Sequence, residues 1–142
     1  MKIRDSGDDG QTIILIIGYV VIALLAISAM LAATAVNLEA RRLQSEADSV
    51  ADAAAHGSGL GSVTATVLTT SVVRARSEQH LVRSGAAGRY ENLELERATL
   101  SDSGTTVLIR LEATVSPPII GWFVPDGIGI GVDASARPSI DQ

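Results

Sequence analysis

The chain has no cysteine and little aromatic content, with one tryptophan, one phenylalanine and two tyrosines in 142 residues. Without cysteine, a disulfide framework, a thiolate nucleophile and a thiolate zinc site are all excluded. The two histidines are too few for a His-rich metal site. Charge is also sparse, since 11 Lys and Arg stand against 16 Asp and Glu, and the formal net charge of −5 rules out a basic nucleic-acid surface.

Apolar residues are abundant and make up 46% of the chain. That content is too high for a disordered tail, and the length allows one modest domain. No nucleophile with a base and an orienting group can be named. The composition therefore predicts a membrane-associated protein that is not an enzyme, with no cofactor, no nucleic-acid partner and no identifiable small-molecule substrate.

Residues 11–38 form an uncharged run of 28 residues. About 20 apolar residues are enough to cross the hydrocarbon core of a bilayer. A cleaved secretory signal has an apolar region of only about 7 to 15 residues. A buried core helix is the remaining alternative, but uncharged apolar runs of this length are typical of membrane spans. We therefore predict a transmembrane helix whose first partner is the lipid bilayer.

Within this span, Ala26, Ala29 and Ala33 form a stripe of small residues at helical spacing. Such stripes let two membrane helices approach closely, and we expect these alanines to pack against another helix, with plain lipid contact as the alternative. The orientation is not decided by charge, because two basic residues precede the span and two follow it.

The helical pattern continues past the span over residues 39–56, where Leu43, Ala47, Val50 and Ala54 recur at three-to-four spacing. Glycines in a linker over residues 57–61 then predict the end of the helix. One helix over residues 12–56 would be about 65 to 70 Å long. We expect residues 39–56 to form a stalk that projects from the membrane and packs, through its alanine-rich stripe, against another helix.

Residues 62–142 are expected to form a small α+β domain. A second helix is predicted over residues 62–84, and strands over residues 92–100, 105–115 and 128–136. The second run alternates apolar and polar residues as a half-buried strand does, and Asp102, Ser103 and Gly104 supply the turn of a hairpin. The expected fold is α+β, with a three-stranded antiparallel sheet and the second helix against one of its faces.

Few residues of this domain invite a chemical role. Residues 127–131 are glycine-rich but lack the spacing and the following helix of a phosphate-binding loop. Glu94 and Glu96 share one face of a strand, which we expect to be solvated. His80 stands on a polar helix surface, where exposure is the ordinary outcome.

Trp122 and Phe123 belong to an apolar cluster and stand between prolines at positions 118 and 125. We expect them to fill the core of a domain that has few other large side chains, with a membrane-interface wedge and a partner surface as the alternatives.

The leader DSGDDG at residues 5–10, the span, and ARRLQSEADSVADAAAHG at residues 40–57 resemble the amino-terminal region of TadE/TadG-like proteins of the tight-adherence (Flp) pilus assembly system. The matching positions are Arg41, Leu43, Gln44, Ala47, Asp48, Ala51 and Ala53 to Ala55. The resemblance implies a single-pass anchor in the cytoplasmic membrane, with residues 1–10 in the cytoplasm and the carboxy-terminal domain outside. It also implies a non-catalytic minor pilin or assembly factor that contacts other Tad pilus or secretion components, or pilins, through the long helix.

The leader departs from the pattern of pilins that are cut after a glycine. With Gly10 as the cut site, the fifth mature position, usually Glu, is Leu15. We therefore expect residues 1–10 to be retained. A minor pseudopilin cleaved after Gly10 and built into the fibre, or a membrane-anchored extracytoplasmic binding module, are the alternatives.

Overall fold

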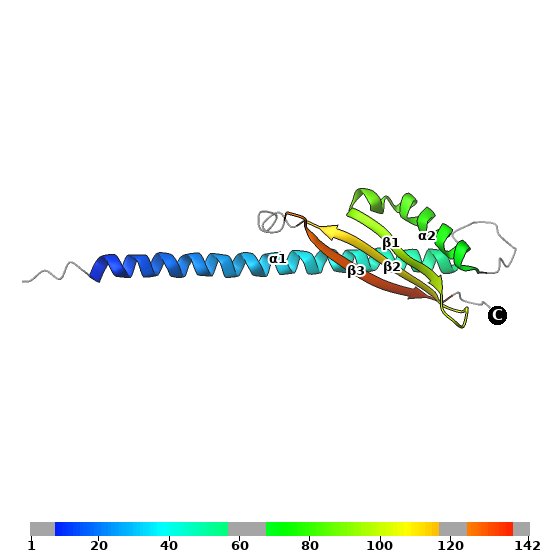
Figure 1. Ribbon diagram of the computed structural model, residues 1–142, viewed down its shortest axis with the longest axis horizontal. Helices are drawn as coiled ribbons and strands as arrows, with labels where there is room; N and C mark the ends of the chain where they lie inside the picture. Colours follow the sequence, from blue (N-terminus) through cyan, green and yellow to red (C-terminus); the bar gives the residue numbers. More distant parts are fainter. Residues whose placement is uncertain (1–7, 57–67, 117–124, 138–142) are drawn as a thin grey trace, which may run out of the picture.

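A computed structural model describes residues 8–56, 68–116 and 125–137. Its elements are, in order, the helices α1 (Asp8–His56) and α2 (Thr70–Ser84), the short 3-10 helix η1 (Ala86–Gly88), and the strands β1 (Glu91–Leu100), β2 (Val107–Val115) and β3 (Ile128–Ala136). The strands form one antiparallel sheet in the order β1-β2-β3. The predicted α+β fold is confirmed (Figure 1).

Helix α1 is continuous over 49 residues, about 73 Å at the usual rise per residue. Its two halves have different surroundings. Figure 1 shows the first half projecting alone, while the second half runs along the domain behind the sheet. The packed second half contacts β2, β3 and α2. One helix is thus both the projecting rod and a layer of the domain.

The apolar stripe on the second half of α1 is entirely inside the domain. Leu43, Ala47, Val50 and Ala54 have no exposed surface and belong to one core cluster with the inward residues of the sheet and of α2. The expectation of a separate projecting stalk over residues 39–56 is therefore corrected. A sheet with one apolar face needs a covering layer, and α1 of the same chain provides it. Besides α2, the stripe faces β2 and β3, which the helical period alone did not indicate.

Strand β2 sits at the centre of the sheet and alternates as the sequence predicted. Val107, Ile109, Leu111 and Ala113 are buried against the helices, and the residues between them are only half-buried on the opposite face. The strand begins at Val107 and not at position 105, because residues 101–106 form the turn, closed by a 2.8 Å bond from Ser101 N to Thr106 O.

Strand β1 begins at Glu91, one residue before the predicted start, and is irregular. Its pairing with β2 shifts between Leu95 and Arg97, so that Glu96 and Arg97 together oppose one residue of β2. Both are exposed, and Ala98 returns to the buried face. This bulge changes which positions of β1 point inward, a change that strict alternation does not predict.

Helix α2 is shorter than predicted. It begins at Thr70 and not at position 62; residues 62–67 lie outside the described part of the chain. Thr69 is extended and accepts a hydrogen bond from Val72 N, which caps the helix, and Gly85 ends it at a φ of 67°. Its buried stripe is Val73, Ser77 and Leu81, spaced by four residues.

The burial of α1 predicts how its two halves respond to the same substitution. Leu43→Ala removes a side chain with no exposed surface and should lower the free energy of unfolding by about 3 kcal/mol. Leu31→Ala, on the same helix where the leucine is 52% exposed, should leave unfolding of the domain nearly unchanged. Denaturant titration of the full chain in detergent measures both. Equal effects would contradict the assignment of α1 to the core.

Two glycines with positive φ predict unequal costs for alanine. Gly85 has a φ of 67° and open space where a Cβ would stand, so Gly85→Ala should cost about 1 to 2 kcal/mol for the left-handed backbone alone. At Gly127, with a φ of 72°, a Cβ would also lie 2.5 Å from Thr114 Cγ2 and 3.0 Å from Val115 O. Gly127→Ala should therefore destabilise the domain clearly more than Gly85→Ala. Thermal unfolding of the two variants compares them directly.

Candidate functional site

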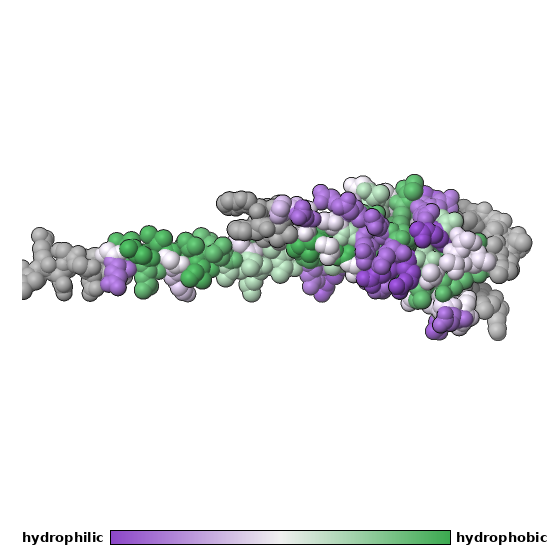
Figure 2. Space-filling model, viewed as in Figure 1, coloured by the Kyte–Doolittle hydropathy of each residue, from purple (hydrophilic) through white to green (hydrophobic). Residues whose placement is uncertain are grey.

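The first half of α1 is a bare apolar surface. Ile14, Tyr19 and Met30 are more than 70% exposed. No residue in the most apolar stretch of this helix is buried. The helix is long and apolar enough to cross a membrane. Figure 2 shows this half as mostly hydrophobic and the domain as mixed, with hydrophilic side chains gathered over the sheet.

Two hydroxyl groups of this bare half are satisfied within the helix. Ser28 Oγ donates to Leu24 O and Thr34 Oγ1 donates to Met30 O, each at 2.9 Å. In hydrocarbon an unpaired hydroxyl is costly, and bonding to the carbonyl one turn back removes that cost. Both polar side chains are therefore compatible with a lipid environment.

The small-residue stripe lies on this bare surface. Ala26, Ala29 and Ala33 are all exposed. The expected stalk residues, in contrast, are buried in the domain. The exposed apolar surface of α1 lies before Glu39, although Ala32 is buried there and Ala35 and Val36 are half-buried.

A polar clasp holds the domain to α1 just beyond the bare half. Glu46 of α1 has a side chain only 14% exposed. Ser84 Oγ at the end of α2 donates to its Oε1 at 2.5 Å, and Arg89 Nη2 donates to its Oε2 at 2.9 Å. These contacts fix the connection from α2 to β1 against α1. Glu46 lies 38 and 43 residues from its partners, and no local sequence signal points to them.

Beside this clasp, a groove of about 320 Å³ lies between α1 and the sheet. It is lined by Leu38 and Glu39 of α1, by Tyr90, and by Val115 and Ser116 at the end of β2, among others. Burial and then the negative charge of Glu39 raise the pKa of Tyr90 above its usual value of 10.0. The phenol is therefore neutral at physiological pH. Figure 1 places this end of the sheet, where β2 ends and β3 begins, toward the projecting half of α1.

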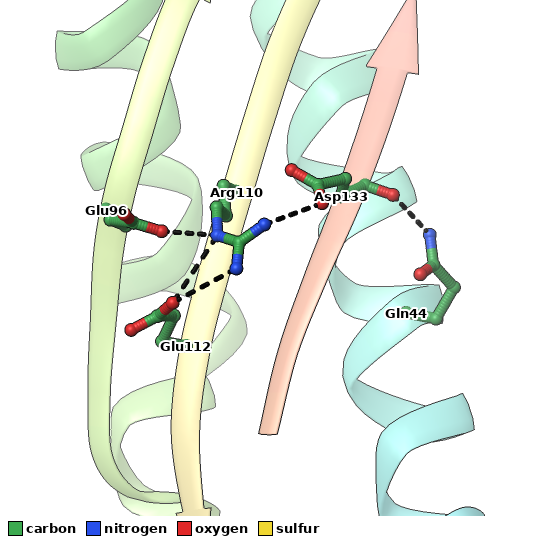
Figure 3. A network of polar contacts seen from close by, with 5 residues as sticks. All are labelled: Gln44, Glu96, Arg110, Glu112 and Asp133. Atoms are coloured by element: carbon green, nitrogen blue, oxygen red, sulfur yellow. Dashed lines mark hydrogen bonds and ion pairs between the residues drawn. The ribbon is translucent and has the colours of Figure 1, made fainter. Parts of the chain in front are cut away.

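The outer face of the sheet carries a charge network centred on Arg110 of β2 (Figure 3). Its guanidinium pairs with Glu96 of β1, with Glu112 at 3.4 Å and with Asp133 of β3 at 2.8 Å. Pairing with Asp133, and then with Glu96, raises the pKa of Arg110 above its ordinary value. The absence of a side chain at Gly131 makes space for the Arg110 guanidinium, because a Cβ there would lie 3.2 Å from Arg110 Nη2.

Gln44 of α1 joins the sheet edge next to this network. Its Nε2 donates to the backbone carbonyl of Asp133 at 2.9 Å and to the carboxylate of Asp48 at 3.1 Å. The first bond occupies a backbone acceptor of the edge strand β3. Arg110 thus holds together the acidic groups of the outer face, and Gln44 ties the edge strand β3 to α1.

One pair of side chains has the composition of a catalytic dyad. Ser49 Oγ of α1 and His80 Nε2 of α2 lie 3.0 Å apart. Within the described ranges, no carboxylate is hydrogen-bonded to the other ring nitrogen of His80, so the third member of a triad is missing there. The pair joins two helices at the surface, where such a bond is ordinary. In the same ranges, no group of three or more metal-ligating side chains is found.

The other residues singled out in the sequence lie at separate places in the structure. Gly129 and Gly131 lie within β3, so the glycine-rich run is mainly strand. Glu94 is exposed on the same outer face as Glu96. Trp122 and Phe123 lie outside the described residues.

The Arg110 network makes a prediction about charge balance. Arg110→Leu leaves Glu96, Glu112 and Asp133 facing one another without their shared cation, so the melting temperature should fall at pH 7. Because salt screens the repulsion, the loss should shrink in high salt. Arg97→Leu removes one cation from the neighbouring strand β1 and is the matched control. A loss in Arg110→Leu that does not change with salt would contradict the electrostatic explanation.

Comparison of the chain with protein-family models, with curated proteins and with solved structures found no match. The structural feature most relevant to function is that the first half of α1 is exposed and apolar, whereas the second half buries its apolar stripe in the domain.

Proposed function

We propose that this chain is a single-pass, non-catalytic membrane protein that acts as a TadE/TadG-like component of a Tad/Flp-type pilus assembly or secretion system. The observation that carries the proposal is the division of α1 into a bare apolar half and a half that is fully used in the core. A surface of exposed Ile, Leu and Val on one helix needs an apolar environment. Lipid and neighbouring membrane helices are the partners that provide it.

The residues that carry the resemblance also have an identifiable physical role. Leu43, Ala47 and Ala51 are fully buried at the contact with the domain, and Gln44 bonds the edge of β3. Small side chains at these positions let a sheet lie close to a helix. Residues 40–56, which carry this part of the resemblance, thus connect the proposed membrane helix to the outer domain.

The proposed orientation places residues 1–10 in the cytoplasm, the bare half of α1 in the cytoplasmic membrane, and the domain outside. Because two basic residues lie on each side of the span, the charge count does not decide the orientation, and the proposed orientation is taken from the resemblance. Contacts with other Tad components or pilins then fall to the bare half of α1 and to the outer surfaces of the domain, because the stripe over residues 39–56 is occupied by the chain itself.

The same bare half also suits the second candidate, a minor pseudopilin built into the fibre. A rod that is apolar over its exposed half can exchange lipid for the helices of other subunits without exposing that surface to water. The two candidates differ in processing. An intact mass that lacks residues 1–10, together with recovery of the chain in sheared pili, would select the pseudopilin.

Site-specific photo-crosslinking in native membranes tests the proposal. A photoreactive residue at Ala29, which is exposed on the bare half, should crosslink to lipid and to pilus-secretion components. The same residue type at Ser103, which is exposed in the β1–β2 turn at the end of the sheet away from the projecting half of α1 (Figure 1), should give no lipid adduct and is the matched control. The partners are identified by mass spectrometry after purification in mild detergent.

Two results would count against this function. If Ala29 gives no adduct with any membrane protein, and the chain is purified alone in every preparation, assembly with a pilus system is refuted. If the full chain is recovered monomeric in the aqueous fraction without detergent, the membrane anchor itself is refuted.

A further inference from the structure

The groove between α1 and the sheet shows how near the domain comes to the bare half of α1. Tyr90, Val115 and Ser116 line it together with Ala35, Leu38 and Glu39 of α1. Residues 35–38 still belong to the uncharged run of the sequence. The domain therefore overlaps the end of the predicted span, and no length of free helix separates the two.

The length of the apolar segment places this overlap relative to a bilayer. A hydrocarbon core of about 30 Å takes about 20 helical residues. If it begins at Ile13, an upright helix leaves it near Ala33, and the headgroup layer of about 5 to 7 Å then covers the next four or five residues. If the helix tilts by about 35°, the hydrocarbon extends to Val36. In both cases Asn37 lies at the level of the lipid headgroups, and Ala35, Leu38 and Glu39 lie in that layer or within about 3 Å of it.

The domain residues at this level suit a lipid interface. Tyr90 is half-buried and neutral, with a ring beside apolar residues and a polar hydroxyl, and tyrosine is enriched at membrane interfaces. Arg41 and Arg42 are exposed on α1 just past the span, held by Asn37 and Glu39 at 3.1 and 2.7 Å. Guanidinium groups at this depth can bond lipid phosphates.

We infer that the end of the domain formed by Tyr90, Val115 and Ser116, here called the rim, rests in the headgroup layer of the membrane that α1 crosses. The inference rests on the proposed function, because it requires α1 to span a bilayer. It differs from the arrangement expected from the sequence, in which a stalk holds the domain away from the membrane. The rim is a lipid-contacting surface, and the bilayer restricts the orientation of the domain.

The absence of cysteine from the chain allows a sharp test, since each introduced thiol is unique. Ser116→Cys places a fluorescent label at the rim, and Ser103→Cys places one in the β1–β2 turn, about 30 Å away along the sheet. Leu25→Cys places a label in the middle of the span. The full chain is reconstituted in phosphatidylcholine and phosphatidylglycerol vesicles that carry a nitroxide quencher either on the headgroup or deep on the acyl chain.

The headgroup quencher should reduce the emission of the Ser116 label at least threefold more than that of the Ser103 label. The acyl-chain quencher should act mainly on the Leu25 label. A helical insert of seven Glu, Ala and Lys residues after Thr34 would raise the domain by about 10 Å while nearly keeping its rotation about the helix axis. In that variant, headgroup quenching at Ser116 should fall to the level at Ser103.

The outcomes separate the two proposals. If the Leu25 label is quenched by acyl-chain nitroxide but the Ser116 label is quenched no more than the Ser103 label, the membrane anchor stands and the rim contact is overturned. The same holds if the insert leaves the Ser116 quenching unchanged. If the Leu25 label is not quenched, α1 does not span the bilayer, and both proposals fail.

Discussion

A single helix that must satisfy two different environments is the constraint on which the structure depends. The half of α1 before Glu39 exposes large aliphatic side chains to its surroundings, and the half after Ala40 buries its apolar stripe within the same chain. In water the first half would be unfavourable, because exposed aliphatic surface is costly. The second half could not be withdrawn into lipid without unfolding the domain. In the proposed membrane orientation, the boundary between the two halves sets how far the domain stands from the lipid.

The domain depends on α1 as much as α1 depends on the domain. A three-stranded sheet needs a layer on its apolar face to be stable, and α2, which contacts β1, covers only part of that face. Leu43, Val50 and the surrounding alanines supply the rest. Glu46 adds a polar clasp to Ser84 and Arg89. Because helix and sheet share one core, a displacement of α1 is a displacement of the domain.

The polar contacts of the domain connect the three strands with one another and connect the sheet with α1. Arg110 gathers carboxylates from all three strands, and Gln44 occupies a carbonyl of the edge strand β3. Edge strands that offer free backbone groups are sites of unwanted pairing, and a helix side chain bonded to one reduces that exposure. These contacts tie the sheet together and to α1. Among the described residues, the exposed large apolar side chains lie mainly on the bare half of α1.

The sequence by itself determined the elements that follow from a repeating period or from a long apolar run. The continuous helix, the alternation of β2 and the turn at Asp102 to Gly104 follow from local patterns, and the α+β fold follows from their order. Only the tertiary structure decided what covers the stripe from Leu43 to Ala54. A helical period shows that a face is apolar and is silent on its partner, because the sheet that packs there lies more than 50 residues further along the chain. The same limit hid the clasp at Glu46 and the bulge at Glu96, since each depends on contacts or backbone geometry that local patterns do not encode.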